Sequence, residues 1–136
     1  MAYATHPPQT AVYTPYTVID KSRQGMPRAE VDRVAGLARL TDVELARILN
    51  MSVRNLHRLK ADDKLARDAS ERLLLLTNLL QHGLDVFDED TQTLTEWLRS
   101  PIRELNSQAP LYLLDTTTGF GLVDDVLGRI EHGIVG

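Results

Sequence analysis

The side chains best suited to a chemical role gather between residues 47 and 60. Arg54 and Asn55 are adjacent, and arginine pairs bidentately with guanine as asparagine does with adenine. Arg47, Arg58 and Lys60 supply the positive charge that a phosphate backbone attracts. This set predicts a DNA contact in which Arg54 and Asn55 meet base edges and the other three side chains meet phosphates.

Patterns that would indicate catalysis or a bound cofactor are missing from the sequence. There is no cysteine, and no histidine has another histidine or an acidic residue at metal-ligand spacing. Asp124 and Asp125 are neighbours, and neighbouring residues of a helix point in different directions. Gly119-Phe120-Gly121 lacks the further glycine and the preceding strand of a dinucleotide-binding loop. We therefore expect no enzyme activity, no cofactor and no metal site.

Charge is divided unevenly along the chain, although the net charge is only -4. Residues 21–67 hold 11 Lys and Arg against 6 Asp and Glu, whereas residues 68–136 hold 4 against 12. This asymmetry favours a polyanionic partner for the first part and a different partner, such as a basic protein, for the second. Two ordinary solvated surfaces are the alternative. Because neither a membrane-spanning run nor a signal peptide is visible, we expect a cytoplasmic protein.

Helical patterns dominate from residue 27 onward and predict an all-α fold. Residues 1–26 show neither a helical nor a strand period, and we interpret them as a flexible N-terminal tail. Residues 27–67 are predicted to hold three helices, over residues 27–39, 42–49 and 53–60. Thr41 and Glu44 have the spacing of a capping box, and Ser52 is suited to cap the third helix and to lie at the DNA.

The last two of these helices predict a helix-turn-helix. In that motif the second helix of the pair enters the DNA major groove, while a preceding helix braces the pair. The alternative is a three-helix packing unit with a solvated basic face. DNA binding by this half requires dimerisation, since one small module buries too little surface for tight specific binding.

Residues 68–136 are predicted to form a C-terminal helical domain around one long central helix. That helix runs from about Asp68 to Phe87, and its leucines cover more than one face, so it is either the centre of the fold or a dimer seam. Shorter helices are expected near Trp97 and Leu111. A last helix is expected from about residue 121 to residue 132, with a packing face made of Val123, Val126, Leu127 and Ile130.

Three stretches of the C-terminal half are more specific than helix periodicity requires. They are Trp97-Leu98, Leu113-Leu114-Asp115-Thr116 and the ending Gly128-Arg129-Ile130-Glu131-His132-Gly133. At these distances they resemble the antitoxin family named after Xre, ParS and MbcA, the partners of RES-domain toxins. The resemblance covers about residues 26–136. It departs from the family in residues 102–108, where members often have an Asn-Pro or a glycine-containing loop.

The resemblance implies a type II toxin-antitoxin function. Members neutralise a RES-type toxin that consumes NAD or uses it to ADP-ribosylate a target, and their C-terminal region blocks the toxin's NAD pocket. Many also repress their own operon through the helix-turn-helix. The implied partners are the cognate toxin and operator DNA, with the chain as a homodimer in a larger complex. Carried over by position, the toxin-binding residues are Arg129, Glu131, His132, Gly133, Ile134, Val135 and Gly136.

Two other functions stay open at this point. A stand-alone helix-turn-helix transcriptional regulator would use the acidic C-terminal half only to dimerise. A protein-interaction module with a degenerate helix-turn-helix is favoured by the overall acidic charge. A neighbouring toxin gene would argue against the first alternative, and salt-dependent operator binding against the second.

Overall fold

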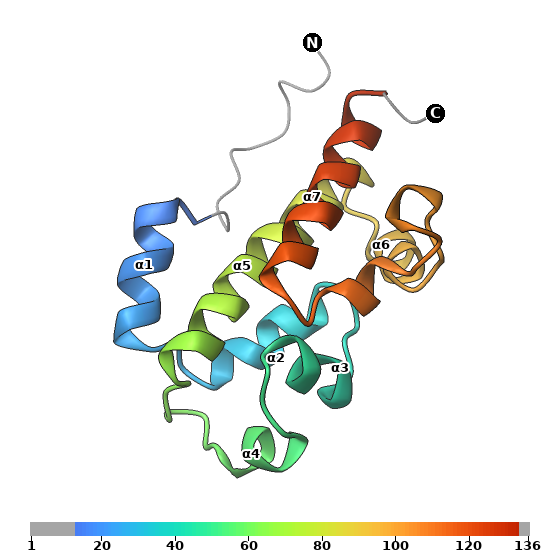
Figure 1. Cartoon of the computed structure of the whole chain (residues 1–136). Coiled ribbons are helices and arrows are strands. Elements are labelled where there is room, and N and C mark those ends of the chain that lie inside the picture. The colour runs from blue at the N-terminus through green and yellow to red at the C-terminus, as the bar shows by residue number, and fades with distance from the viewer. Residues whose placement is uncertain (1–12, 134–136) are drawn as a thin grey trace.

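Figure 1 shows the protein as a computed structural model, which describes residues 13–133. Over this range the chain is all-helical, as predicted, with two isolated β-bridges in place of any sheet. No helix in residues 13–133 has the length and apolar character needed to cross a bilayer. The elements in chain order are α1 (Pro15–Gln24), α2 (Ala29–Gly36), α3 (Asp42–Ile48), α4 (Val53–Arg58), α5 (Arg67–Val86), α6 (Thr91–Leu98), η2 (Arg103–Leu105), η3 (Pro110–Leu113) and α7 (Thr117–Glu131).

Helix α1 occupies part of the predicted flexible tail, so that prediction was wrong for residues 15–24. The Thr14 hydroxyl caps the helix by accepting a hydrogen bond from the Thr17 backbone N–H, and Gly25, with φ at 87°, ends it. Only Val18 and Ser22 of α1 are buried as the helix packs on α5. A face this narrow leaves no clear apolar period in the sequence. The rest of the predicted tail, residues 1–12, lies outside the described residues.

Helices α3 and α4 form the predicted helix-turn-helix, with α2 preceding them. The predicted capping box of Thr41 and Glu44 is present at the start of α3. Ser52 caps α4, because its hydroxyl accepts a hydrogen bond from the Asn55 backbone N–H at 3.0 Å. Between the two helices Asn50 adopts the left-handed conformation, with φ at 58°, and reverses the chain. These local signals position α4 with one side exposed.

Helix α5 is the centre of the fold. Of the two roles predicted for its leucines, core or dimer seam, the structure therefore shows the core. The helix is flanked by α1 and α7 (Figure 1), and α2 and α6 also contact it. One hydrophobic cluster extends from Val18 in α1 to Leu127 in α7, so the two halves of the chain share a core. The leucines that α5 buries in this core are Leu73, Leu74, Leu76, Leu79, Leu80 and Leu84.

Helix α7 begins at Thr117, before the expected start near residue 121, because Thr116 provides a cap. The Thr116 hydroxyl accepts a hydrogen bond from the Gly119 backbone N–H at 3.0 Å. Only glycine fits at position 119, since a Cβ atom there would lie 1.7 Å from the Leu113 carbonyl oxygen. The predicted packing face is confirmed: Val123, Val126 and Leu127 are buried, and Ile130 packs partly against the core.

Candidate functional site

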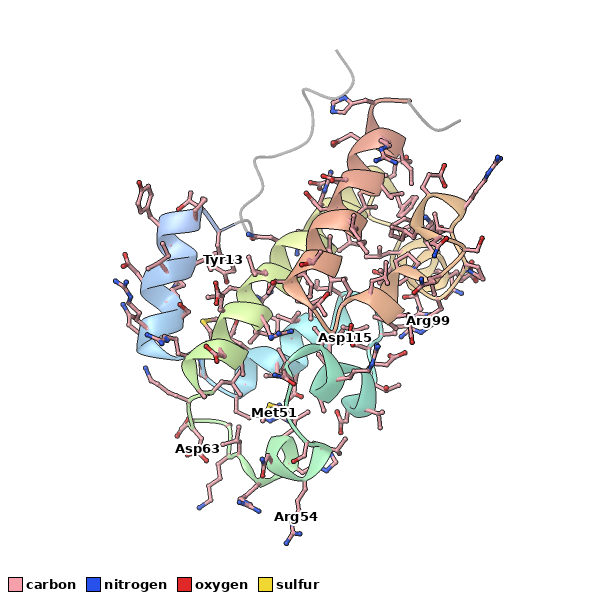
Figure 2. The ribbon with its side chains drawn as sticks, viewed as in Figure 1. Tyr13, Met51, Arg54, Asp63, Arg99 and Asp115 are labelled. Carbon is pink, nitrogen blue, oxygen red and sulfur yellow. The ribbon has the colours of Figure 1, made fainter. Side chains whose placement is uncertain are left out.

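Helix α4 presents an exposed, positively charged surface at one end of the molecule. Figure 2 shows Arg54 pointing away from the body of the protein. Arg54, Asn55, Arg58 and Lys60 are all exposed, and their side chains have no hydrogen bond or ion pair within residues 13–133. Cationic side chains without intramolecular partners are available to phosphates. Ser52 differs, because its hydroxyl already caps α4, and its contact with DNA stays a prediction.

A histidine–carboxylate pair joins α4 to the beginning of α3. His57 Nε2 lies 2.6 Å from Asp42 Oδ2, and both side chains are about half exposed. These residues are 15 positions apart, so the search for partners at metal-ligand spacing did not include this pair. The pair is a contact between the two helices of the helix-turn-helix.

Arg47 is bound to the C-terminal half of the chain. Its Nη2 donates a hydrogen bond to the Tyr112 carbonyl oxygen at 2.8 Å and lies 3.3 Å from Asp115 Oδ2. The guanidinium carbon is 4.9 Å from the centroid of the Tyr112 ring, a cation–π contact. Because these partners compete with phosphate, Arg47 is a weaker candidate than Arg54 or Arg58, and its predicted role in DNA binding stays a prediction.

Arg99 also joins the C-terminal half to the helix-turn-helix and lines the same surface pocket as Arg47. Its Nη2 donates to the Arg39 carbonyl oxygen at 3.1 Å and to Glu44 Oε1 at 2.7 Å, while its Nη1 donates to the Thr95 carbonyl oxygen at 2.9 Å. Figure 2 shows Arg99 and Asp115 where the C-terminal elements meet α3. We call the contacts of Arg47 and Arg99 the junction. Through it α3 and the C-terminal half hold one orientation.

The last turn of α7 and the residues after it form the second candidate surface. Arg129, Glu131, His132 and Gly133 are all exposed. The Arg129 side chain has no partner among residues 13–133. The predicted toxin-binding residues 134–136 lie outside the described residues. The structure thus brings the described members of the predicted set to one end of one helix.

Glu131 is held in place by a histidine of α5 that the sequence analysis did not single out. His82 Nε2 donates to Glu131 Oε1 at 3.1 Å, and His82 Nδ1 donates to Asp124 Oδ1 at 2.6 Å. The Asp124 hydrogen bond, with that of Glu131, raises the pKa of His82 from 6.5 to about 9, although burial opposes the charge. His82 is therefore an imidazolium at neutral pH, and both ring nitrogens donate.

No local signal could have found this cluster. Asp124 and Glu131 are seven residues apart, so helical spacing places them on one side of α7. Their partner His82 stands on another helix, and the packing of α5 on α7 alone brings the three together. Among the described residues no group of three or more histidine, aspartate or glutamate side chains is arranged to hold a metal ion.

The fold and its two surfaces define a helix-turn-helix protein with a C-terminal helical binding domain. The family model of the antitoxin Xre-like helix-turn-helix domain matches residues 17–78, which include most of α1. The model of the antitoxin Xre/MbcA/ParS C-terminal toxin-binding domain matches residues 82–133.

Full-length relatives agree with both matches. An Antitoxin Xre of Photorhabdus laumondii is 31% identical over 113 residues, covering 82% of this chain and 76% of the relative. An Antitoxin Xre of Yersinia enterocolitica is 28% identical over 86% of this chain and 80% of its own length. A Sphingobium protein named Prs ADP-ribosylating antitoxin is 26% identical over 88% of this chain and 81% of its own length. The chain belongs to the Xre/MbcA/ParS antitoxin family.

Proposed function

We propose that this antitoxin neutralises a RES-type toxin, which consumes NAD or uses it to ADP-ribosylate a target, by blocking the toxin's active site with its C-terminal end. The observation that carries the proposal is the exposed last turn of α7, which ends the matched toxin-binding domain. The name of the Sphingobium relative, Prs ADP-ribosylating antitoxin, supports a partner of this chemistry.

Glu131 is the side chain best placed to imitate a negatively charged ligand. Its carboxylate is 44% exposed while His82 fixes its orientation, so it is both accessible and positioned. A pocket for the anionic pyrophosphate of NAD presents cations, which an acidic surface approaches favourably. His132 Nε2 lies 4.0 Å from the same Glu131 carboxylate oxygen that His82 binds.

Removal of residues 131–136 tests this proposal, because it takes away Glu131 and the residues after it but leaves the buried face of α7 in the chain. The shortened chain keeps Ile130 against the core and the Asp124–His82 contact. We expect it to bind the purified product of the neighbouring gene yet to leave that protein's NAD consumption uninhibited. A chain lacking residues 1–12 is the control and should inhibit fully. Full inhibition by the chain without residues 131–136 would contradict the occlusion mechanism.

We also propose that the protein binds operator DNA and represses its own operon. The observation that favours this second function is the set of exposed side chains on and after α4 that lack partners in residues 13–133. In this arrangement Arg54 and Asn55 meet base edges near the start of α4, while Arg58 and Lys60 meet the backbone. A stand-alone transcriptional regulator is the alternative, and it would keep this DNA contact without a toxin.

The double variant Arg54→Ala with Asn55→Ala tests the operator contact. Each lost bidentate base contact costs about 1–3 kcal/mol, so binding to the upstream operator fragment should fall at least tenfold. Arg103→Ala changes an exposed arginine on η2 and is the matched control. Binding of toxin should be unaffected by either change. An unchanged operator shift in the double variant would move recognition away from α4.

The proposed assembly is a homodimer within a larger toxin-antitoxin complex in the cytoplasm. We assign residues 27–67 to DNA binding and residues 68–136 to toxin binding and dimerisation. The shared core and the junction make these two parts of one packed unit. The mass of the complex co-expressed with the neighbouring gene product measures the stoichiometry directly.

A further inference from the structure

An apolar groove runs between α5 and α7, away from the C-terminal end of the chain. Its volume is about 310 Å³. Its lining is mostly apolar and consists of Leu75, Asn78 and Leu79 from α5 and Thr117, Phe120 and Gly121 from α7. Figure 1 shows the two helices side by side along most of their length. Asp124 lines the same groove and gives it an acidic edge.

Neither the packing nor the backbone conformation of residues 13–133 requires a glycine at positions 121 and 128 of α7. Glycine destabilises a helix interior relative to alanine, so its presence there calls for a reason. Gly83 and Gly119 have one, because a Cβ atom would collide with Leu94 or with the Leu113 backbone. A Cβ atom at Gly121 or Gly128 would meet nothing within 4 Å, and neither glycine has a positive φ.

The positions of these glycines connect them to the groove. Gly121 lines it, and Gly128 lies seven residues further along α7, which is about two turns on the same side of the helix. Between them stands Asp124, and Glu131 follows Gly128 by one turn. This side of α7 is therefore open to a close backbone approach at Gly121, and beyond Asp124 the His82 side chain of α5 joins the two carboxylates that flank Gly128.

We propose that the α5–α7 groove, with Gly121 and Gly128 beside it, is a second docking surface for the toxin, separate from the C-terminal end. The fitting partner segment is an amphipathic helix that places an apolar side chain against Leu75, Leu79 and Phe120 and a Lys or Arg against Asp124. This inference rests on the proposed antitoxin function. Two observations select the toxin as occupant: α7 lies in the matched toxin-binding domain, and its carboxylates complement a basic partner.

A second copy of this chain fits the groove less well. A symmetric dimer formed through this face would bring the patch that carries Asp124 and Glu131 against the same patch of the other copy. Like charges placed together oppose association. A partner segment that carries a Lys or Arg against Asp124 does not meet this repulsion.

Substitution of the two glycines tests the groove, and the chain offers a matched control. Gly121→Gln and Gly128→Gln add a long, uncharged, helix-favouring side chain where the protein has open space. Gly36→Gln makes the same change at the exposed end of α2, where a Cβ atom also meets nothing within 4 Å. The probe is the purified product of the neighbouring gene, with its Kd measured by calorimetry and each antitoxin's Tm measured by circular dichroism.

We expect each α7 variant to bind at least tenfold more weakly than the wild type, with an unchanged or raised Tm, and Gly36→Gln to bind within twofold of the wild type. If the α7 variants bind as the wild type does, the groove is not a toxin surface, although the proposed function stands. If they lose self-association and keep toxin binding, the occupant is a second copy and the inference is overturned. If the wild-type chain does not bind the probe, the proposed function fails, and this inference fails with it.

Discussion

The two ends of the molecule hold their charged side chains in different ways. At α4, Arg54 and Arg58 extend from the surface without partners in residues 13–133. At the end of α7, the Glu131 carboxylate is oriented by a protonated His82, which Asp124 also holds. Free cations suit a phosphate backbone, where affinity comes from displacing counterions along many equivalent charges. A fixed carboxylate suits a single pocket, where one position must be matched.

Arginines at the junction show that residue type alone does not assign either role. Arg47 and Arg99 belong to the same residue type as Arg54, yet their guanidinium groups bind carbonyl oxygens and carboxylates within the protein. Arg72 of α5 similarly donates to the Ile48 and Asp115 carbonyl oxygens. These contacts bring the basic and acidic halves into one structure, and they are made by side chains that the sequence would equally allow at the DNA.

The largest effect is expected from displacing α7, which would disturb the Glu131–His82 contact at its end while leaving α4 intact. Gly119→Ala places a Cβ atom 1.7 Å from the Leu113 carbonyl oxygen. The resulting strain should lower the free energy of unfolding in urea by about 3 kcal/mol. Gly121→Ala, two positions further along the same helix, should instead raise it by up to about 1 kcal/mol. Equal stability of the two variants would show that the α7 backbone at Gly119 does not lie against the Leu113 carbonyl oxygen.

The junction arginines should differ from the α4 arginines in their effect on stability. Arg99→Ala leaves the Glu44 carboxylate and the Arg39 carbonyl oxygen without their donor. We expect a loss of about 2 kcal/mol in the free energy of unfolding, because hydrogen bonds to charged groups are among the stronger ones. Arg54→Ala should change it by less than about 0.5 kcal/mol, as exposed substitutions do. A reversed order in urea titrations would contradict the division into bound and free arginines.

His82 should make the stability of the α5–α7 contact pH-dependent. Its folded pKa, about 9, lies above its ordinary value of 6.5, so its stabilising effect is complete below pH 6.5 and is lost as the pH rises to 9. The Asp124 and Glu131 carboxylates are about half exposed, which limits the effect to about 1 kcal/mol. The stability difference between the wild type and His82→Gln should shrink by this amount from pH 6 to pH 9.5. A constant difference would exclude the imidazolium.

The smallest effect is expected at α4, whose arginines have no partner in residues 13–133. Arg58→Gln should weaken operator binding several-fold at physiological salt and reduce the log–log salt slope by about 1, the signature of one lost phosphate contact. Arg47→Gln should change the slope less, because the Arg47 guanidinium is bound to Tyr112 and Asp115. Equal slopes for the two variants would mean that Arg47 leaves the junction when DNA binds.

Local signals in the sequence were enough for much of the fold but not for the contacts between helices. The capping box of Thr41 and Glu44, the Ser52 cap and the leucines of α5 each specify structure within a few residues, and all were recovered. Helix α1 was missed because Val18 and Ser22 alone face the core. The His82 cluster and the partners of Arg47 join residues 42 and 65 positions apart, a separation at which spacing carries no information.

Competition with NAD tests the central claim most directly, namely that the C-terminal end of the chain occupies the toxin's NAD pocket. The Kd of the chain for the neighbouring gene product is measured by calorimetry at increasing concentrations of a non-hydrolysable NAD analogue. We predict that the apparent Kd of the whole chain rises linearly with the concentration of the analogue, while that of the chain lacking residues 131–136 stays constant. An apparent Kd of the whole chain that does not depend on the analogue would contradict the claim.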